Sequence, residues 1–470
     1  MPTQQTPKAK RPRWPQIIWN SSQKGDQGAD ASHAPRILGI CPWIYDFAAY
    51  NLWSRPVGLM ACMHMLRCSG AKTALLDCLD PMWRDIEWPK QRFYGHGTWP
   101  KTQVPAPSFL RHIPRRFSRY GQDPVLVRGA LQALDPPPDA VLITTSMTYW
   151  YPGAVAAANL VRSLWPQVMI IAGGVYASLC PDHARSLECF DLVLPGPLED
   201  TENWRTLWTV LQSSPPPLPE GSGLALDPTA YPAPDFSAVL GSRGCPYACA
   251  YCATSTLHPQ FIQKSASRVI QEVDIDLSRG VLDFAFYDDA LLVNPEKWLI
   301  PFLQRLRHTG TRLHTPNALH PRHLTPKLAV LLKQAGLCTV RLGLESSDFT
   351  NRLDNKLTID DWNHGLDCLF SAGFSSQQIG AYILFGLPDQ EDRSVEAAID
   401  LARASGIRPH LAQYSPIPGT QLFAKAQAHS PYPLDQEPLY HNNALWPCVP
   451  GGFSWQKRTK WRDRLAGKGS

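Results

Sequence analysis

Short apolar runs alternate with longer stretches of helical periodicity along most of the chain. From Arg36 onward, five of these runs are rich in Val, Ile and Leu, and helical segments lie between them. Continuous apolar runs of this length are typical of parallel strands that are buried on both faces. The five predicted strands span residues 36–40, 73–77, 139–146, 167–174 and 191–196. The pattern predicts an α/β fold that begins with a Rossmann-like parallel sheet.

A second alternating series follows after residue 234. Its apolar helical stretches include residues 325–336, which end on the helix-stopping Gly336. The predicted strands span residues 238–244, 282–289, 312–319, 338–346, 378–388 and 409–419. Six strand–helix units predict a partial (β/α)6 barrel, whose chemistry is expected at the carboxyl ends of the strands.

The segments around these two series set the expected domain boundaries. Residues 1–33 are rich in Lys, Gln, Ser and Gly and are expected to form a disordered basic tail. Residues 79–122 are too long for a plain connection and predict a functional insertion or lid. The Pro-rich residues 214–233 predict a linker. We therefore expect a first domain over 34–213, a barrel over 234–425, and an irregular C-terminal extension with a basic tail over 426–470.

Charge and cysteine content exclude several classes of function. The formal net charge is +5, but basic residues gather in residues 1–13 and 457–470, so the body between them is net acidic. A net acidic body makes nucleic acid an unlikely partner. The chain has no long uncharged apolar stretch and no apolar signal-peptide core, so neither a membrane span nor secretion is expected. Twelve cysteines without regular pairing fit a reducing compartment, which predicts a cytoplasmic protein.

The sequence GSRGCPYACAYCATS, residues 241–255, is the strongest chemical signal in the chain. It places Cys245, Cys249 and Cys252 at Cys-x3-Cys-x2-Cys spacing after the first strand of the second series. Thiolates bind iron–sulfur clusters, and a cubane needs four ligands, so three cysteines leave one iron open. A structural zinc site would need a further Cys or His, usually in a matching pair. The candidates for that fourth ligand occur singly, at Cys180, Cys338, Cys368 and Cys448.

This motif and the strand ends that follow it resemble the radical S-adenosylmethionine (SAM) superfamily over about residues 234–425. The resemblance implies a [4Fe–4S] cluster whose open iron chelates SAM, and reductive cleavage of SAM to a 5′-deoxyadenosyl radical. It also implies that Tyr251, the aromatic residue before the third cysteine, lies near the adenine. The second-strand sequence FYDDA offers Asp288 and Asp289 to the methionine amine. The Gly-Gly-Glu form of many relatives is absent, so the choice between the two aspartates stays open.

Later strand ends extend the resemblance in family order. Asn317, in PNALH, matches a polar position after the third strand. Glu345, in RLGLES, is similar to the polar residue that holds the ribose or methionine end of SAM. Gly386, in ILFGLP, would let the backbone approach the adenine. Gln413 belongs to QYSPIPGT, which resembles the sixth-strand segment of the subgroup that includes methylthiotransferases and coproporphyrinogen-type enzymes.

The first sheet, placed before such a barrel, resembles the cobalamin-binding domain of cobalamin-dependent radical SAM proteins. Ser146, in TTSMTYW, matches a serine that approaches the cobalamin tail, and Gly173 and Gly174 match a Gly-Gly turn that packs against it. The Asp-x-His-x-x-Gly sequence of many cobalamin proteins is missing, and CPWIYDFAAYNLWSRP, residues 41–56, stands in its place. Radical relatives also bind cobalamin without that histidine. The alternative is a Rossmann-like domain that has lost cobalamin and only shapes the substrate pocket.

Two further segments leave their interpretation open. Residues 41–56 join aromatic side chains to Asp46 and Asn51, which suits either stacking against a planar ligand or packing of a helix start on the sheet. An arginine cluster at residues 115–119 suits either a phosphate or carboxylate site or a solvated loop.

These features predict a radical SAM enzyme, with cobalamin as a further cofactor and methyl transfer to a small molecule as a possible reaction. Ring contraction or cyclisation would use the same motifs. Such an enzyme needs a reductant such as flavodoxin or ferredoxin. One alternative is an RNA-modifying methylthiotransferase-like enzyme, and another is a non-catalytic iron–sulfur electron-transfer or sensor protein. Cys448 as a fourth cluster ligand would favour the last alternative.

Overall fold

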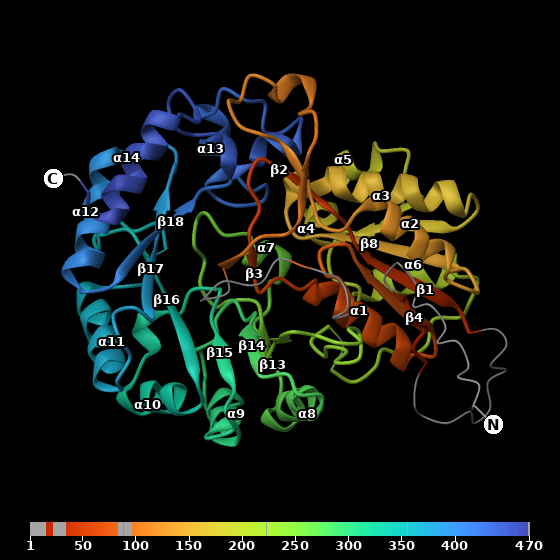
Figure 1. Ribbon diagram of the computed structural model, residues 1–470, viewed down its shortest axis with the longest axis horizontal. Helices are drawn as coiled ribbons and strands as arrows, with labels where there is room; N and C mark the ends of the chain where they lie inside the picture. Colours follow the sequence, from red (N-terminus) through yellow and green to blue (C-terminus); the bar gives the residue numbers. More distant parts are fainter. Residues whose placement is uncertain are drawn as a thin grey trace, which may run out of the picture.

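Two parallel sheets lie side by side in the computed structural model (Figure 1). The structure describes residues 16–21, 34–82, 88, 96–221, 223–354 and 356–468. The strands of the first sheet are β1 (Arg36–Cys41), β4 (Lys72–Asp77), β8 (Ala140–Thr145), β9 (Met169–Gly173) and β10 (Leu192–Val193). They run parallel in the order β10-β9-β8-β1-β4, which confirms the five predicted strands. The chain reverses its direction of sheet growth between β1 and β8, and open α/β sheets bind ligands at such a point.

Helices cover both faces of this sheet, as the apolar strands predict. Ile37 and Leu38 are neighbours on β1, and each is buried in a different hydrophobic cluster because successive side chains point to opposite faces. The covering helices are α1 (Val57–Cys68), α2 (Pro124–Gln132), α3 (Tyr151–Leu164), α4 (Gly174–Leu179), α5 (Pro181–Arg185) and α6 (Thr201–Val210).

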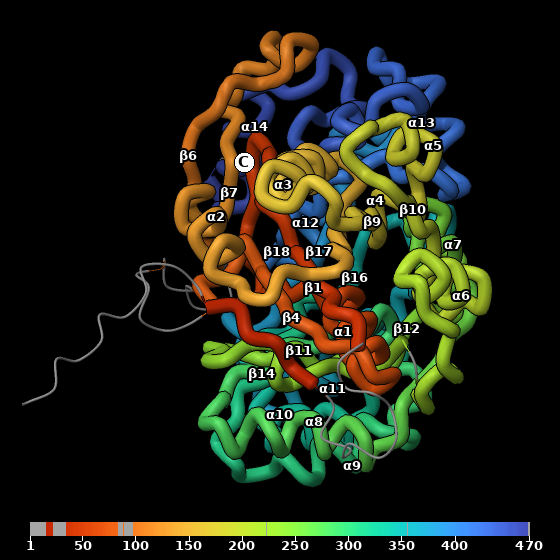
Figure 2. The backbone as a smooth tube through the Cα atoms, turned by 90° about the vertical axis from the view of Figure 1, so that its right-hand side faces the viewer, coloured from red at the N-terminus to blue at the C-terminus, as the bar shows by residue number. Residues whose placement is uncertain are grey.

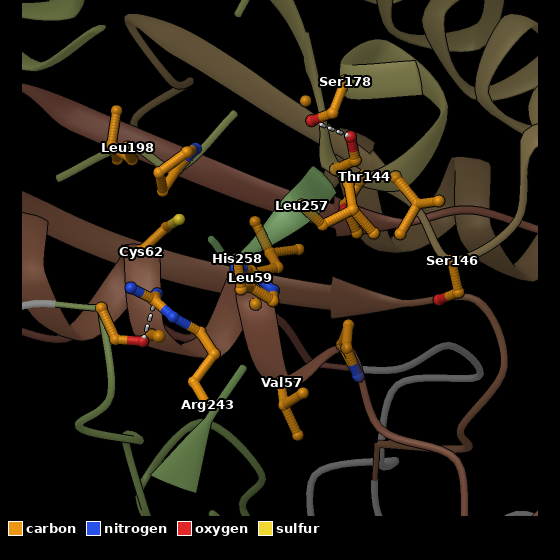
Figure 3. A pocket seen from close by; sticks show the side chains of 18 of the residues that line it. Val57, Leu59, Cys62, Thr144, Ser146, Ser178, Leu198, Arg243, Leu257 and His258 are labelled. Atoms are coloured by element: carbon orange, nitrogen blue, oxygen red, sulfur yellow. Dashed lines mark hydrogen bonds between the residues drawn. The ribbon is translucent and has the colours of Figure 1, made fainter. Parts of the chain in front are cut away.

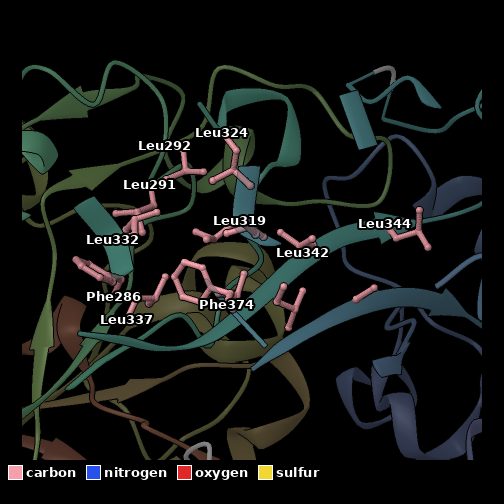
Figure 4. Packing of buried hydrophobic residues seen from close by; sticks show 14 of the residues in the cluster. Phe286, Leu291, Leu292, Leu319, Leu324, Leu332, Leu337, Leu342, Leu344 and Phe374 are labelled. Atoms are coloured by element: carbon pink, nitrogen blue, oxygen red, sulfur yellow. The ribbon is translucent and has the colours of Figure 1, made fainter. Parts of the chain in front are cut away.

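The second sheet is the predicted partial barrel. Its strands are β11 (Ser237–Val239), β14 (Asp283–Phe286), β15 (Arg312–His314), β16 (Leu337–Glu345), β17 (Ile379–Phe385) and β18 (Arg408–Gln413), which pair in parallel and in chain order. The helices between them are α8 (Ala266–Ser278), α9 (Leu299–Leu306), α10 (Pro326–Gln334), α11 (Ile359–Ser371) and α12 (Asp392–Ala404). Leu332, Leu337 and Phe374 belong to the core between strands and helices (Figure 4).

Small antiparallel sheets and short helices complete the connections. In the segment predicted as an insertion, β7 (Ser118–Tyr120) pairs with β6 (Lys101–Gln103) on one side and with β2 (Ile44–Asp46) on the other. Residues 83–87 and 89–95 lie outside the described residues. The remaining short elements are β3 (Asn51–Leu52), β5 (His96–Gly97), η3 (Ser108–Leu110), η4 (Thr148–Trp150), β12 (Ser242–Arg243), α7 (Thr254–Leu257), β13 (Ile262–Gln263) and η5 (Pro321–His323).

The C-terminal extension is more regular than the sequence predicts. It forms α13 (Phe423–His429), η6 (Pro438–His441), η7 (Asn443–Leu445) and α14 (Trp455–Ala466), and it lies beside the β6–β7 segment in both views (Figure 1, Figure 2). The expected basic tail is therefore wrong over α14. Lys460 lies 2.9 Å from Glu396 and 3.2 Å from Asp392 of α12, and Trp461 is buried. The basic residues pair with an acidic helix, so their charge does not indicate a free tail.

Two other segments also differ from expectation. Within the Pro-rich residues 214–233, Leu224, Leu226 and Tyr231 are buried in the cluster that contains α1 and α6, so this stretch packs between the sheets and is not a free linker. Near the N-terminus, Asn20 pairs with Thr73 at the edge of β4, so residues 16–21 are ordered against the sheet. The rest of the predicted tail, residues 1–15 and 22–33, lies outside the described residues. Among the described helices, none has the length and apolar character of a membrane span.

Candidate active site

The carboxyl ends of the two sheets face one cavity of about 470 Å³ (Figure 3). Ser146, Gly173 and Gly174 line it from the first sheet, after β8 and β9. Asp289 and Asn317 line it from the barrel, after β14 and β15. Residues predicted from two separate motif sets therefore share one space.

The cavity extends into the layer between α1 and the first sheet. Leu59, Cys62 and Met65 line it from α1, while Leu142 and Ile171 line it from the strands. Figure 3 shows Leu59 and Cys62 on the helix and Thr144 and Ser146 near the strand ends. Helix–sheet layers are normally packed as densely as organic crystals, with few voids larger than a water molecule. A cavity that extends into such a layer leaves room there for an apolar group of a ligand.

The two glycines at the end of β9, Gly173 and Gly174, shape the wall of the cavity in different ways. Gly174 has a φ of +83°, and a Cβ there would lie 2.4 Å from Oγ1 of Thr144, so the backbone itself requires glycine. Gly173 is extended, and a Cβ there would meet nothing within 4 Å. The absent side chain of Gly173 therefore leaves open space beside the cavity.

The three cysteines of the motif lie on the loop between β12 and α7 and are half-buried. Within the described part of the chain, no three Cys, His, Asp or Glu side chains are gathered closely enough to hold a metal ion. Burial raises the pKa of Cys249 to about 11, while the ammonium of Lys356 lowers it. Three thiols on one loop beside a cation have the donor chemistry of an iron–sulfur site, because nearby positive charge favours the thiolate ligand.

The two aspartates after β14 have different surroundings. Asp288 is buried, and its carboxylate accepts hydrogen bonds from the Ser242 hydroxyl at 2.6 Å and from the Gly241 amide at 3.3 Å. Asp289 accepts from the amide of Gly244, next to the first cysteine of the motif, at 3.2 Å. Asp289 also lines the 470 Å³ cavity and a pocket of about 40 Å³ beside Cys245. These contacts favour Asp289 as the ligand-binding carboxylate and Asp288 as a structural one.

The other residues predicted to contact SAM lie outside the lining of the 470 Å³ cavity. The Tyr251 hydroxyl donates to Asp354 at 3.3 Å. Glu345 ends β16 at a register shift, with a φ of +61°, and burial raises its pKa to about 7. Gly386 lines a separate cavity of about 110 Å³, and Gln413 is exposed at the end of β18. The lining of the 470 Å³ cavity does not include these four residues.

Comparison with known proteins identifies the barrel. Residues 239–402 match the family model of the Radical SAM superfamily. These residues form a radical SAM domain, and the chain is therefore a radical SAM enzyme. The domain implies SAM, a [4Fe–4S] cluster, a small-molecule substrate and a reductant.

Similar proteins extend this finding. The enzyme is 26% identical over 333 residues to an uncharacterized methyltransferase of Pyrococcus horikoshii, covering 62% of this chain and 70% of the relative. It is 24% identical over 283 residues to bacteriochlorophyllide d C-12(1)-methyltransferase of Chlorobaculum tepidum, covering 54% and 59%. The solved structure of the radical SAM methyltransferase TsrM from Kitasatospora setae, bound to tryptophan and a SAM analog, has a TM-score of 0.59 and 15% identity. That likeness covers 84% of this chain and 76% of TsrM, so it includes both sheets.

Two residues of the site, His320 and Lys356, are not among the candidates that the sequence analysis names. His320 stacks on Tyr247 with ring centroids 4.9 Å apart, and it lines the 40 Å³ pocket together with Lys356. Burial and the charge of Lys356 lower the pKa of His320 to about 3, which keeps the ring neutral. His320 is the last residue of PNALH, where the sequence analysis names only Asn317. Lys356 lies in the loop before α11, where no spacing signal indicates it.

Two segments with open interpretations have structural roles in the enzyme. Asp46 is buried and accepts from Nε1 of Trp150 at 2.7 Å and from Nδ2 of Asn442 at 2.9 Å. Arg115 donates to the carbonyl of Ala444 at 2.9 Å. Both side chains therefore attach the N-terminal half to the C-terminal extension. The Cys448 thiol is buried in an apolar cluster, which is the environment of a packing residue.

Proposed function

We propose that this radical SAM enzyme is a cobalamin-dependent methyltransferase that acts on a small molecule. The observation that carries the proposal is the single cavity lined by Ser146, Gly173 and Gly174 on one side and by Asp289 and Asn317 on the other. A methyl donor above the first sheet and a SAM molecule above the barrel would meet there. The relatives named as methyltransferases support this reaction class over ring contraction or cyclisation.

The residues on each side would have separate tasks. Cys245, Cys249 and Cys252 would hold the cluster, and Asp289 and Asn317 would orient the methionine end of SAM. When bound, the cluster with SAM supplies a radical, and cobalamin supplies a methyl carrier. The protein must position the substrate between them and exclude water, because orientation and protection are what the fold adds to cofactor chemistry.

The slot between α1 and the first sheet fits the cobalamin assignment. Its walls are largely apolar, and it opens beside Gly173, where no side chain obstructs entry. A flat apolar end of the cofactor's nucleotide loop would displace the water that otherwise meets Leu59 and Leu142. Ser146 is exposed at the rim and can donate a hydrogen bond to a polar group of the entering ligand.

An anaerobic absorption spectrum of the reconstituted full-length protein tests the proposal. Hydroxocobalamin is supplied, and unbound cofactor is then removed. Iron–sulfur absorption with stoichiometric corrinoid bands is the expected result. Cluster absorption without corrinoid would rule out methyl transfer through cobalt and leave the first sheet a substrate-shaping role.

A further inference from the structure

Arg55 is a buried cation between the two halves of the enzyme. It lies just before α1, is 7% exposed and lines the 470 Å³ cavity. Neither the cluster motif nor the cobalamin-like motifs include it.

Four groups hold Arg55 in place. Its Nη1 lies 2.5 Å from Oδ2 of Asp80, and its backbone amide donates to the Tyr287 hydroxyl at 2.5 Å. The guanidinium carbon lies 3.9 Å from the ring centroid of Tyr231 and 4.2 Å from that of Phe236. The rings attract the cation and restrict its rotation. The guanidinium is therefore fixed before any ligand arrives.

One end of this guanidinium is left without a partner. Nη2 of Arg55 is buried, and no described residue accepts a hydrogen bond from it. Arginine cannot lose its proton in a protein, and a buried donor without an acceptor destabilises the fold. A bound ligand in the adjoining cavity can supply the missing acceptor.

The charges around Arg55 define what kind of acceptor suits it. Asp80 already neutralises the guanidinium, and Asp77 lies nearby, where it accepts from the Tyr231 hydroxyl at 2.7 Å. A carboxylate or phosphate ligand would face two acidic side chains across a single cation, and like charges repel. A neutral carbonyl oxygen avoids that repulsion. The corrin ring of cobalamin carries such groups as side-chain amides.

We propose that Arg55 donates from Nη2 to an amide carbonyl of the corrinoid in this cavity. The inference rests on the proposed function. A carbonyl of the substrate has the same chemistry, but Arg55 directly precedes α1, the helix that forms one wall of the apolar slot. This position associates it with the ligand that enters the slot.

The test is the dissociation constant of hydroxocobalamin, measured by anaerobic spectral titration of the reconstituted full-length enzyme. Arg55→Lys keeps the charge but loses the planar pair of donors, and Arg55→Met loses both. Each variant is expected to weaken binding about tenfold or more, since a hydrogen bond to a charged group is lost. Arg67→Met is the matched control, because it removes another Arg–Asp ion pair, 2.5 Å to Asp227, in the last turn of α1 and outside the lining of the cavity. It is expected to lower the melting temperature and to leave the dissociation constant unchanged.

The possible outcomes distinguish failure of this inference from failure of the proposed function. Wild-type affinity in both Arg55 variants would overturn the inference and leave the proposed function intact, with a substrate carbonyl as the remaining acceptor. An equal loss of affinity in Arg67→Met would also overturn it, since the loss would then come from a general destabilisation of α1 and not from the Nη2 donor. Absence of corrinoid binding in the wild type would overturn both proposals together.

Discussion

Asn442 donates a 2.9 Å hydrogen bond to the carboxylate of Asp46, although the two residues lie 396 positions apart in the chain. The contact joins the C-terminal extension to the last residue of β2. We expect Asn442→Ala to lower the free energy of unfolding by about 1–3 kcal/mol, because Asp46 stays buried with one donor fewer. Urea unfolding measures the change. Asn351→Ala, on an exposed turn, is the control, and an equal effect of the two variants would contradict the role of this contact.

Cys249→Ala is expected to abolish cluster assembly and SAM cleavage while the first sheet stays folded. Two thiols and no further ligand cannot retain a cubane. Iron content, cluster absorption and far-ultraviolet circular dichroism check this result. Cys68→Ala, at an exposed cysteine on α1, should keep the full iron content. SAM cleavage by Cys249→Ala would remove these cysteines from the mechanism.

Substitutions at the two aspartates after β14 should affect different properties of the enzyme: SAM binding at Asp289 and stability at Asp288. Asp289→Asn is expected to weaken SAM binding about tenfold or more, because it removes a charge next to the cluster loop. Asp288→Asn should leave SAM binding within about threefold of wild type, because its carboxylate faces Ser242 and Gly241. Equilibrium dialysis with labelled SAM measures both, at matched iron content. The reverse ranking would exchange the two roles.

Asp288 is also expected to make the stability of the folded enzyme depend on pH. Burial raises the pKa of its carboxyl to about 7, so the folded state binds a proton that the unfolded state has lost above about pH 4. This contribution to stability is present at low pH and is lost as the pH rises toward 7. Asn does not titrate, so Asp288→Asn should gain stability relative to wild type between about pH 5 and about pH 8. Parallel urea titrations test this, and a constant difference would contradict it.

Gly173→Val is expected to fill the entrance of the apolar slot. The extended backbone of Gly173 accepts a side chain without strain, and the space beside it is open. The variant should therefore fold, assemble the cluster and bind SAM, but lose stoichiometric hydroxocobalamin. Those retained properties are the internal control. Normal corrinoid retention would place the cofactor away from this glycine.

The fold could be predicted from the sequence because its signals are local. Most strands of the two sheets carry an apolar run of their own, and Gly336 ends a helix with a φ of +93°. The C-terminal extension could not be predicted in this way. Its α14 is stabilised by Lys460 against Asp392 and Glu396, and such a pairing between distant helices leaves no periodic signal. Composition alone therefore indicated a free tail.

Candidate site residues could be named from the sequence where a motif fixes their spacing, but not where they lie outside a motif. Ser146, Gly173, Asp289 and Asn317 were indicated separately, but their meeting in one cavity depends on how the sheets face each other. Arg55 and Lys356 belong to no motif, and His320 ends the PNALH motif that indicated only Asn317. The importance of all three comes from burial and from neighbours that only the tertiary structure provides.

The shared cavity makes the two halves thermodynamically interdependent. Neither sheet alone encloses the space, and the C-terminal extension bonds to the N-terminal loops. A ligand that binds this space stabilises whatever must be folded to form it. A cofactor seated above the first sheet would therefore also protect the barrel against unfolding, so that the halves melt as one cooperative unit when loaded. Cutting the chain between the sheets would yield two fragments, each with half a binding site.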